Sequence, residues 1–388
     1  MILKNCKIVT EKEIFKGDIL IEDRKIKKIG VGLKGKEKLD VKGKPVIPGI
    51  IDVHVHARDF DQRYKEDFES CSKAAIANGV TFIADMPNTS PPVIDEKKFK
   101  LRIELAKRKC LVNFGIIFGI TNENKKDAEK VHPFAYKIYM DGTLGEISQE
   151  TLKYAIKNFF CCIHAEGEER TPESEEKAVK KICRLAEKFK NPCHICHISY
   201  RGSLKHLNKY TTCEVTPHHL LLTYEDFKRL GSIAKVNPPL KTREDNKALL
   251  LALKKGRIPI IASDHAPHSL EEKESENPPP GIPNLDVMLK LLLTLAHKKI
   301  LDLHTIVRAT SKNPAKIFGL KTKGEIKVGY DADLVVLDLE KRGTIEPEEF
   351  YSKAKYSPFS GWKTYGGVDT VVLGGKLAFY DQEIILKK

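Results

Sequence analysis

Short apolar runs alternate with longer amphipathic segments through the middle of the chain. The apolar runs read as buried strands, because they are short and rich in β-branched and aliphatic residues. They are residues 50–55, 80–85, 112–118, 136–140, 160–164, 194–198, 212–215 and 259–263. Helical spacing of hydrophobic residues falls between them, at residues 66–78, 95–109, 123–131, 148–158, 173–190, 201–208 and 243–255. This alternation predicts an α/β fold, a (β/α)8 TIM-like barrel over residues 48–321.

An open doubly wound sheet is the alternative for such an alternation. It is disfavoured because no G-x-G-x-x-G pattern follows the first strand. The two ends of the chain show a different pattern, with short strands separated by glycines. These strands are predicted at residues 7–9, 18–22, 25–29, 324–329, 332–337, 368–373 and 375–379. We therefore expect residues 1–47 and 322–388 to form one composite β-sandwich domain.

Composition and charge narrow the class of protein. The 388 residues are 41% hydrophobic and 31% charged, which is typical of a folded globular chain. The longest apolar runs, such as residues 289–296, are too short to span a membrane. Lys and Glu interrupt the apolar residues near the N-terminus, so no signal peptide is visible. We expect a cytoplasmic protein with no membrane partner.

The formal net charge of +14 raises the question of nucleic-acid binding. The basic residues are spread along the chain beside acidic ones, which favours a solvated, ion-pair-rich surface, and no recognition motif is visible. We expect no nucleic-acid partner. The nine cysteines are expected to be reduced, and Cys193 and Cys196 lack a second pair at zinc-site spacing.

Polar residues with metal-binding or acid–base chemistry fall at the ends of several predicted strands. His54 and His56 are two residues apart, so they share one face of the first strand. The later strands contribute Lys137, His164, His197 and Asp264. The carboxyl ends of barrel strands surround one opening, where active sites of this fold lie. The sequence therefore predicts one site containing all six side chains.

This set resembles the two-metal centre of the amidohydrolase superfamily, and the resemblance covers nearly the whole chain. Within the superfamily's cyclic amidohydrolases, the motifs most resemble those of the dihydroorotases. The motifs are H-V-H-A-R at residues 54–58, D-M-P-N-T at 85–89, V-N-P-P-L at 236–240 and D-H-A-P-H at 264–268. The segment at residues 324–335 is also typical of the final β segment of these enzymes.

The resemblance implies two Zn²⁺ ions in each subunit. It assigns His54, His56 and Asp264 to one ion and His164 and His197 to the other. It also implies that CO2 converts Lys137 into a carbamate that bridges the two ions. Burial would lower the pKa of the Lys137 amine and favour this reaction. Asp141 is the competing bridging residue, because some dihydroorotases use an aspartate near this position.

The implied reaction is the reversible, zinc-dependent cyclisation of N-carbamoyl-L-aspartate to L-dihydroorotate in de novo pyrimidine biosynthesis. In ring opening, a metal-bridging hydroxide would attack the ring carbonyl, and Asp264 would serve as general acid and base. Further residues are implied to bind the substrate. They are Arg58, Asn88 and His268 for the carboxylate, Asn237 for the ring amides, and Thr143 as a lid residue.

Two features depart from the family pattern or lie outside it. Asp59 and Phe60 follow Arg58 where dihydroorotases commonly have Pro-Gly, so Asp59 is a potential competitor for the Arg58 guanidinium. Glu214 and His218 near the seventh strand can bind metals, but strand-end residues of these types often support other ligands, and we interpret both as structural.

Alternative functions keep the same fold. An allantoinase or a hydantoinase (dihydropyrimidinase) would share the metal ligands but would not need the Arg58 carboxylate site. A non-enzymatic scaffold is disfavoured because every expected ligand is present. The sequence leaves open whether the chain forms a homo-oligomer and whether it associates with aspartate transcarbamoylase.

Overall fold

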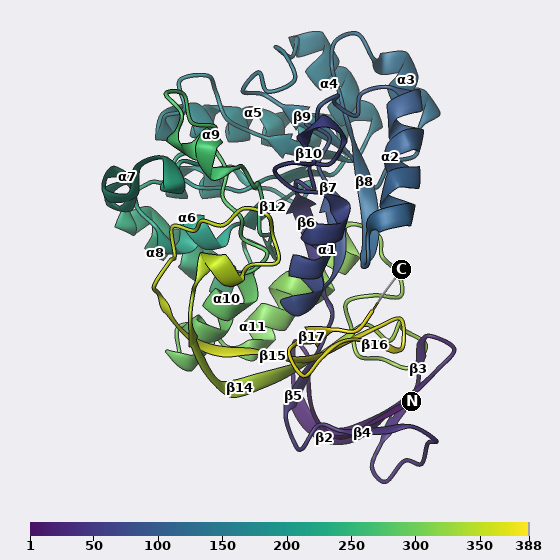
Figure 1. The fold of residues 1–388 in the computed structure, drawn as a ribbon. Coiled ribbons are helices and arrows are strands. Elements are labelled where there is room, and N and C mark those ends of the chain that lie inside the picture. Colours follow the sequence, from purple (N-terminus) through teal and green to yellow (C-terminus); the bar gives the residue numbers. More distant parts are fainter. Residues whose placement is uncertain (387–388) are drawn as a thin grey trace.

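The computed structural model describes residues 1–386, and eight parallel strands form a nearly closed barrel at its centre (Figure 1). Each strand pairs with the strand before and after it in the chain, in the order β6 to β13. The strands are β6 (Ile50–Val55), β7 (Val80–Asp85), β8 (Asn113–Gly119), β9 (Ala135–Tyr139), β10 (Cys161–His164), β11 (Cys193–Ile195), β12 (Thr211–Val215) and β13 (Ile260–Ile261). The predicted (β/α)8 barrel is confirmed.

The gap between β13 and β6 is closed by contacts beyond the regular strands. His265 forms a parallel bridge with Val55, and its carbonyl accepts a hydrogen bond from His56 N at 2.8 Å. Ser263 N donates to Asp52 Oδ1 at 3.1 Å. The first and last strands of the barrel are thus joined at the level of the predicted site.

Helices surround the barrel, and several begin where the sequence provides a capping side chain. Asp67, Asp95, Ser148, Thr171 and Thr242 each accept a hydrogen bond from a backbone N–H of the first turn. The helices that follow them are α1 (Phe68–Ala77), α2 (Glu96–Lys109), α4 (Gln149–Asn158), α5 (Pro172–Phe189) and α8 (Arg243–Lys254). The other α-helices are α3 (Lys125–Lys130), α6 (Pro217–Leu221), α7 (Tyr224–Leu230), α9 (Leu270–Glu274), α10 (Met288–His297), α11 (Leu303–Val307) and α12 (Asn313–Ile317). The segment predicted as a helix at residues 201–208 is a 3-10 helix, Arg201–His206.

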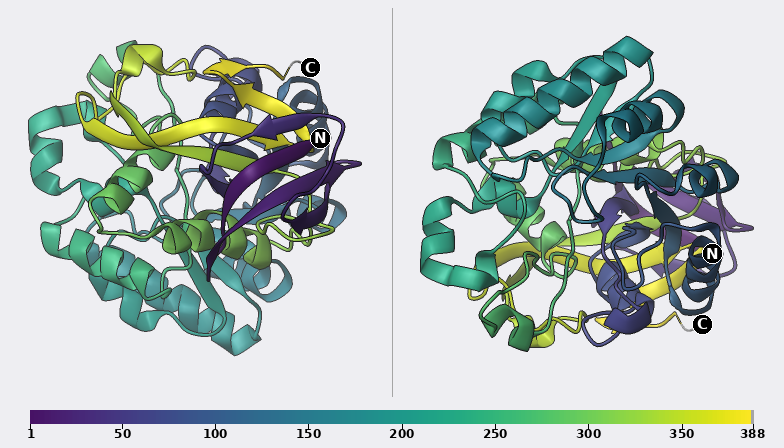
Figure 2. Two further views of the ribbon diagram at one scale, coloured as in Figure 1. Left: turned by 90° about the horizontal axis from the view of Figure 1, so that it is seen from below. Right: turned by 90° about the horizontal axis from the view of Figure 1, so that it is seen from above.

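The two ends of the chain form a second sheet of nine strands, which lies below the barrel in Figure 1 and faces the viewer in the left view of Figure 2. Its strands are β1 (Ile2–Val9), β2 (Ile14–Glu22), β3 (Lys25–Gly30), β4 (Lys38–Asp40), β5 (Pro45–Pro48), β14 (Leu334–Thr344), β15 (Lys363–Leu373), β16 (Lys376–Tyr380) and β17 (Glu383–Ile384). Antiparallel pairing of β5 with β14 joins the N-terminal strands to the C-terminal strands. This sheet has its own apolar cluster.

One predicted strand of this sheet is wrong. The segment from Gly324 to Gly329 is a turn, because both glycines adopt positive φ angles of 82° and 87°. Ile326, between them, is buried in the cluster of the terminal sheet. The division of the chain at residues 47/48 and 321/322 stays a prediction.

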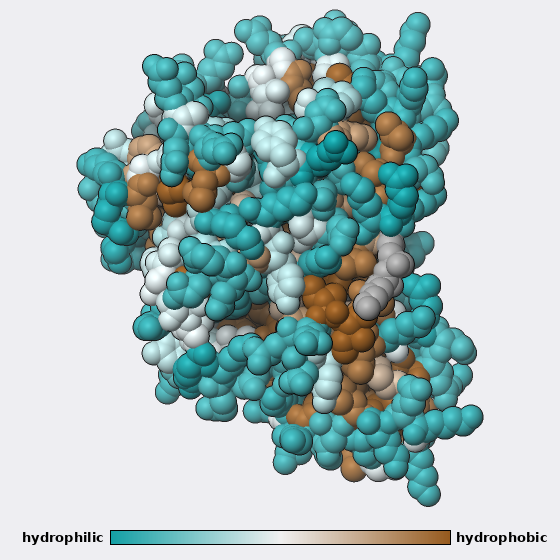
Figure 3. Space-filling view, in the orientation of Figure 1, coloured by the Kyte–Doolittle hydropathy of each residue, from teal (hydrophilic) through white to brown (hydrophobic). Residues whose placement is uncertain are grey.

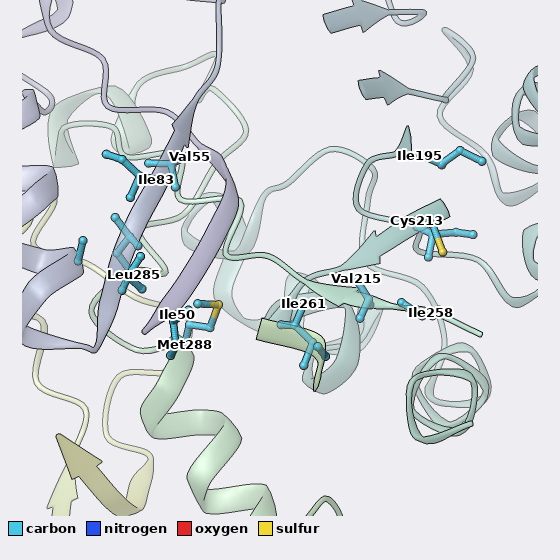
Figure 4. Close-up of a cluster of buried hydrophobic side chains, with 14 of the residues drawn as sticks. Ile50, Val55, Ile83, Ile195, Cys213, Val215, Ile258, Ile261, Leu285 and Met288 are labelled. Atoms are coloured by element: carbon cyan, nitrogen blue, oxygen red, sulfur yellow. The ribbon is translucent and has the colours of Figure 1, made fainter. Parts of the chain in front are cut away.

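Side chains of the barrel strands alternate between two apolar clusters, one inside the barrel and one beneath the helices. Part of the outer cluster is shown in Figure 4, including Ile83, Val215 and Ile261. The inner cluster includes Ala135, Cys162 and Ala262. Two residues further along β9 and β10, on the same face, come two predicted site residues, Lys137 and His164, whereas Asp264 lies beyond the end of β13. The alternation thus directs these polar side chains to the interior, above an apolar base.

Most of the face shown in Figure 3 is hydrophilic, as expected from the many charged residues. Within residues 1–386, no helix combines the length and apolar character that a membrane span requires.

A fully buried ion pair lies where helix α2 meets the barrel. Arg102 Nε donates to Asp85 Oδ2 at 2.7 Å, and both side chains are 0% exposed. The guanidinium also lies over the ring of Phe68, at 4.2 Å from its centroid. Asp85 Oδ1 accepts a hydrogen bond from Ala57 N at 3.0 Å. The pair therefore supports the backbone between His56 and Arg58.

We predict that Asp85→Ala lowers the free energy of unfolding by about 3–5 kcal/mol, because it leaves a buried guanidinium without its counter-charge. Urea denaturation measures this change. Glu69→Ala is the control, since Glu69 forms an exposed pair with Lys73 and its loss should matter far less. Equal losses for the two variants would contradict the assignment of Asp85 as a structural counter-charge.

Candidate active site

A cavity opens at the carboxyl ends of the barrel strands, and most of the predicted site residues line it. Those at its wall are His54, His56, Arg58, Asn88, Thr143, His164, His197, Asn237 and Asp264. Lys137 is fully buried on the interior face of β9, and His268 does not line the cavity. The structure therefore brings together side chains that lie more than 200 residues apart in the sequence.

The metal-binding atoms of this cavity face one another. The Nε2 atoms of His54 and His56 each lie 3.3 Å from Asp264 Oδ1. His164 Nδ1 lies 3.0 Å from His197 Nε2. Ligand atoms of His54, His197 and Asp264 all lie within 4.8 Å of one another. Imidazole nitrogens with a carboxylate are a donor set that suits zinc, so these residues fit a metal site.

The outward nitrogens of the three histidines at the strand ends each have an oxygen partner. The pairs are His54 Nδ1 with a Glu214 carboxylate oxygen, His56 Nδ1 with Asn88 Oδ1 at 2.7 Å, and His164 Nε2 with Glu166 Oε2 at 3.1 Å. A ring nitrogen that donates to such an oxygen leaves a lone pair on the other nitrogen, which faces the centre. These partners therefore orient the rings so that their other nitrogens are free to bind a metal ion.

Glu214 holds more than one group in place. Its Oε2 lies 3.0 Å from His194 Nε2, and its Oε1, the oxygen beside His54, also accepts from His197 N at 3.3 Å. The charges of His54 and His194, with their hydrogen bonds, outweigh burial and keep the pKa of Glu214 far below its usual value. The carboxylate form of Glu214 is thus favoured behind the histidine rings.

Lys137 lies beneath the histidines and carries no carboxylate partner in the described part of the chain. Its Nζ is 3.0 Å from Cys196 Sγ and 4.9 Å from the ring centroid of Tyr139. The expected fall in the pKa of Lys137 is wrong for this structure. Burial alone would lower it, but the neighbouring Cys196 and Tyr139 outweigh burial and raise the pKa above its usual value.

Asp141, the competing bridging residue, lies on the far side of His164. Its Oδ2 is 3.7 Å from His164 Nε2, the nitrogen that points away from His197, and 3.6 Å from Arg170 NH2. Thr143 Oγ1 donates to Asp141 Oδ1 at 2.8 Å. Asp141 therefore lines the cavity and contacts Thr143 and the outer nitrogen of one histidine, His164.

Arg58 is a buried cation at the cavity wall, and no ion pair to it is present within residues 1–386. It is 5% exposed, its Nε donates to Pro267 O at 3.1 Å, and its NH2 lies 3.1 Å from His268 Nε2. Asp59 does not compete for it, because both Asp59 oxygens lie 3.1 Å from Lys109 Nζ. A buried guanidinium without an anion is costly, so this position favours binding of an anionic group.

The backbone of this first loop adopts an unusual conformation. Arg58, Asp59 and Phe60 have positive φ angles of 53°, 54° and 49°, which non-glycine residues seldom adopt. Asp59 stabilises this conformation by accepting from Phe60 N at 3.0 Å and from Phe68 N at 3.3 Å. Such strain clusters at functional sites, and here it aims Arg58 at the cavity.

The predicted substrate residues take different positions around Arg58. Asn88 uses Oδ1 for His56, so its amide Nδ2 remains for a ligand in the cavity. Asn237 also lines the cavity. His268 lies beside Arg58 and contacts its guanidinium, and it is not among the residues that line the cavity.

Sequence reasoning missed two residues that belong to the site. Tyr139 lines the cavity with a buried hydroxyl that has no partner among the described residues. Its position two residues after Lys137, on the same strand face, was the sequence feature that could have identified it.

The second missed residue is Cys196, which forms with His54 and Glu214 a further set able to hold a metal ion. Cys193, by contrast, lies in the outer apolar cluster. His218 stays structural in our interpretation, with its Nδ1 2.9 Å from Asn284 Nδ2.

Comparisons with known proteins agree with this geometry. A family model described as the amidohydrolase family matches residues 46–378. The dihydroorotase of Pyrococcus horikoshii is 42% identical over 98% of this chain and 92% of its own length. The dihydroorotase of Methanothermobacter thermautotrophicus is 38% identical over 99% of this chain and 95% of its own length.

Solved structures with the same fold include hydantoinases. The L-hydantoinase (dihydropyrimidinase) from Arthrobacter aurescens has a TM-score of 0.96 at 27% identity, covering 100% of this chain and 97% of that chain. A D-hydantoinase has a TM-score of 0.92 at 25% identity, and the match covers 99% of this chain and 96% of the hydantoinase chain. The sequence relatives and the structural neighbours therefore share one architecture but carry the names of different cyclic amidohydrolases.

We predict that Glu214→Gln lowers zinc affinity by about tenfold or more, because the uncharged amide orients His54 less firmly. Competition with a chelator measures the affinity. Glu176→Gln is the matched control, since Glu176 binds Lys205 and His206 at the surface, away from the cavity. Unchanged zinc affinity in Glu214→Gln would show that Glu214 does not support the metal ligands.

Proposed function

The chain belongs to the amidohydrolase family, on its dihydroorotase branch, and from this membership we propose that it interconverts N-carbamoyl-L-aspartate and L-dihydroorotate in pyrimidine biosynthesis. It is a metal-dependent hydrolase whose substrate is a small cyclic amide. The buried, unpaired Arg58 at the cavity wall is the observation that carries the choice of substrate.

Arg58 separates this substrate from those of the structural neighbours. L-Dihydroorotate has a carboxylate outside its ring, whereas dihydrouracil has none. A carboxylate would give the guanidinium the anionic partner that the described residues do not supply, through two parallel hydrogen bonds. An uncharged ring would leave the Arg58 charge buried and unpaired. A buried, unpaired guanidinium therefore fits the substrate of a dihydroorotase, the name of the sequence relatives, better than that of a hydantoinase, the name of the structural neighbours.

We propose that the site holds two zinc ions. The ligands would be His54, His56 and Asp264 for one ion, and His164 and His197 for the other. When bound, such ions polarise a carbonyl and lower the pKa of water to near neutrality. The donor atoms described above support this assignment, because their free lone pairs face one common space.

Lys137, as a carbamate, is the bridging group that we propose, in preference to Asp141. The charge of Lys137 is close enough to help lower the pKa of His197 well below its usual value, after burial and His164. Its neighbour Cys196 belongs to the same group of side chains as His54. Lys137 thus lies next to residues of both ligand sets, while Asp141 lines the cavity but contacts only one of the histidines, His164, from its outer side.

Asp264 is the residue that we propose as general acid and base. Its carboxylate lies at the cavity wall between the rings of His54 and His56. In ring opening it would accept the proton of the attacking water and deliver it to the leaving amide nitrogen. Arg58 and the Asn88 amide would hold the carboxylate of the substrate, and Asn237 would bind the ring. Thr143 would close over the substrate by exchanging its bond to Asp141.

We predict that the zinc-loaded protein opens the L-dihydroorotate ring with a higher kcat/KM than the rings of dihydrouracil or allantoin. Arg58→Met should lower kcat/KM for L-dihydroorotate by about 100-fold or more, because it removes the charge-assisted hydrogen bonds to the carboxylate. Steady-state kinetics on the three substrates measures both effects.

Arg63→Met is the matched control, because Arg63 is exposed and lies in the same loop. It should leave kcat/KM for L-dihydroorotate unchanged. Preferential turnover of dihydrouracil or allantoin by the unmodified protein would replace the proposed function with that of another cyclic amidohydrolase.

A further inference from the structure

His268 lies between two cations and one anion, in a cluster that the reaction as described above does not use. Its Nε2 is 3.1 Å from Arg58 NH2. Its Nδ1 is 3.2 Å from Lys65 Nζ and 3.3 Å from Glu272 Oε2. His268 and Lys65 are 6% and 7% exposed, so water contributes little to this cluster.

Hydrogen-bonding capacity fixes the state of the His268 ring. Burial and the charges of Arg58 and Lys65 hold the pKa of His268 far below its usual range, so the ring is neutral. The Arg58 guanidinium and the Lys65 ammonium can only donate, and they face Nε2 and Nδ1 respectively, so a neutral ring can accept from only one of them. The Glu272 carboxylate is the acceptor beside the ring; it lies at Nδ1 and binds Lys65 through its other oxygen. A ring proton on Nδ1 therefore has Glu272 as its acceptor, Lys65 keeps its bond to Glu272, and the lone pair on Nε2 is left for Arg58.

Glu272 is itself held in position from several sides. Lys65 Nζ lies 2.7 Å from its Oε1, and Tyr64 Oη donates to the same oxygen at 2.8 Å. Ser269 N donates to Oε2 at 3.1 Å, at the start of helix α9. Tyr64 and Lys65 follow the first barrel strand, whereas Glu272 and Ser269 follow the last. The cluster therefore connects the segment that follows the first barrel strand to the segment that follows the last one.

The charges of the cluster leave one positive charge for a ligand. Lys65 and Glu272 neutralise each other, and neutral His268 adds nothing, so the charge of Arg58 remains. This matches one carboxylate. Glu272 does not form an ion pair with Arg58, because the His268 ring lies between the carboxylate and the guanidinium.

We propose that Glu272, supported by Lys65, is a positioning residue for recognition of the substrate carboxylate: it fixes the proton of His268 on Nδ1, and the free Nε2 then holds the Arg58 guanidinium towards the cavity. This inference rests on the proposed function and deepens it. It makes His268 a positioning residue as well, acting through Arg58.

The proposal predicts an effect opposite in sign to that of simple electrostatics. Removing the negative charge of Glu272 would make the pocket more positive, so a purely electrostatic role predicts a lower KM for an anionic substrate. A positioning role predicts a higher KM, because His268 no longer orients Arg58. The direction of the change therefore distinguishes the two roles.

The experiment compares Glu272→Leu, Glu272→Gln and the matched control Glu271→Leu in the zinc-loaded full chain. Glu271 is the exposed neighbour on the same helix and has the same charge. For L-dihydroorotate, we expect KM to rise about tenfold in Glu272→Leu with little change in kcat. Glu272→Gln should restore most of the loss, because its amide oxygen still accepts from Nδ1. Glu271→Leu should match the unmodified protein.

A lower or unchanged KM in Glu272→Leu, or equal effects of the Leu and Gln variants, would overturn the proposal.

A second measurement is independent of turnover and of the stability of the Leu variant. In ¹⁵N-histidine spectra, with His268 identified by its loss in His268→Gln, the unmodified protein should carry the His268 proton on Nδ1. A proton on Nε2 would reject the inference. Absence of dihydroorotase activity with the proton on Nδ1 would instead reject the proposed function alone.

Discussion

The parallel register of the eight barrel strands is the constraint on which the rest of the structure depends. It places Lys137 of β9 directly beside Cys162 of β10, and Tyr139 beside His164. Because side chains alternate, neighbouring strands deliver their interior residues at matching heights. A shift of one residue in either of these strands would turn Lys137 or His164 outward, beneath the helices. The chemistry of the cavity is thus a consequence of backbone hydrogen bonding.

The site concentrates charges that the protein alone does not fully compensate. Arg58 has no ion-pair partner, and Lys137 contacts a thiol, within the part of the chain that the structure describes. The folded chain tolerates these groups because the surrounding barrel and the Asp85–Arg102 pair supply packing and support. Anything that binds the folded state alone stabilises it, so anions and metal ions at this site add to stability as well as to function.

Much of the fold and the centre of the site could be predicted from the sequence, because both depend on periodicity. Residues such as His54, His164 and Asp264 end strands whose pattern is strong, and the barrel brings strand ends together. The positions that were not predicted lie where periodicity stops. His268 lies four residues after Asp264, in a segment without regular structure. Its position beside Arg58 depends on contacts with Lys65, after the first barrel strand, and with Glu272 of helix α9. Gly324–Gly329 reads as a strand because its apolar residues alternate, yet two left-handed glycines make it a turn.

The pairing of β5 with β14 has a consequence for how the chain is made. Residues 45–48 leave the ribosome long before residues 334–344, the strand that completes their sheet. At synthesis rates of about 5–20 residues per second, the edge of β5 stays unpaired for tens of seconds. Exposed strand edges promote aggregation. The nascent chain therefore passes through a long interval in which its N-terminal strands need protection by a chaperone or by the forming barrel, and sequence separation rather than stability sets the length of that interval.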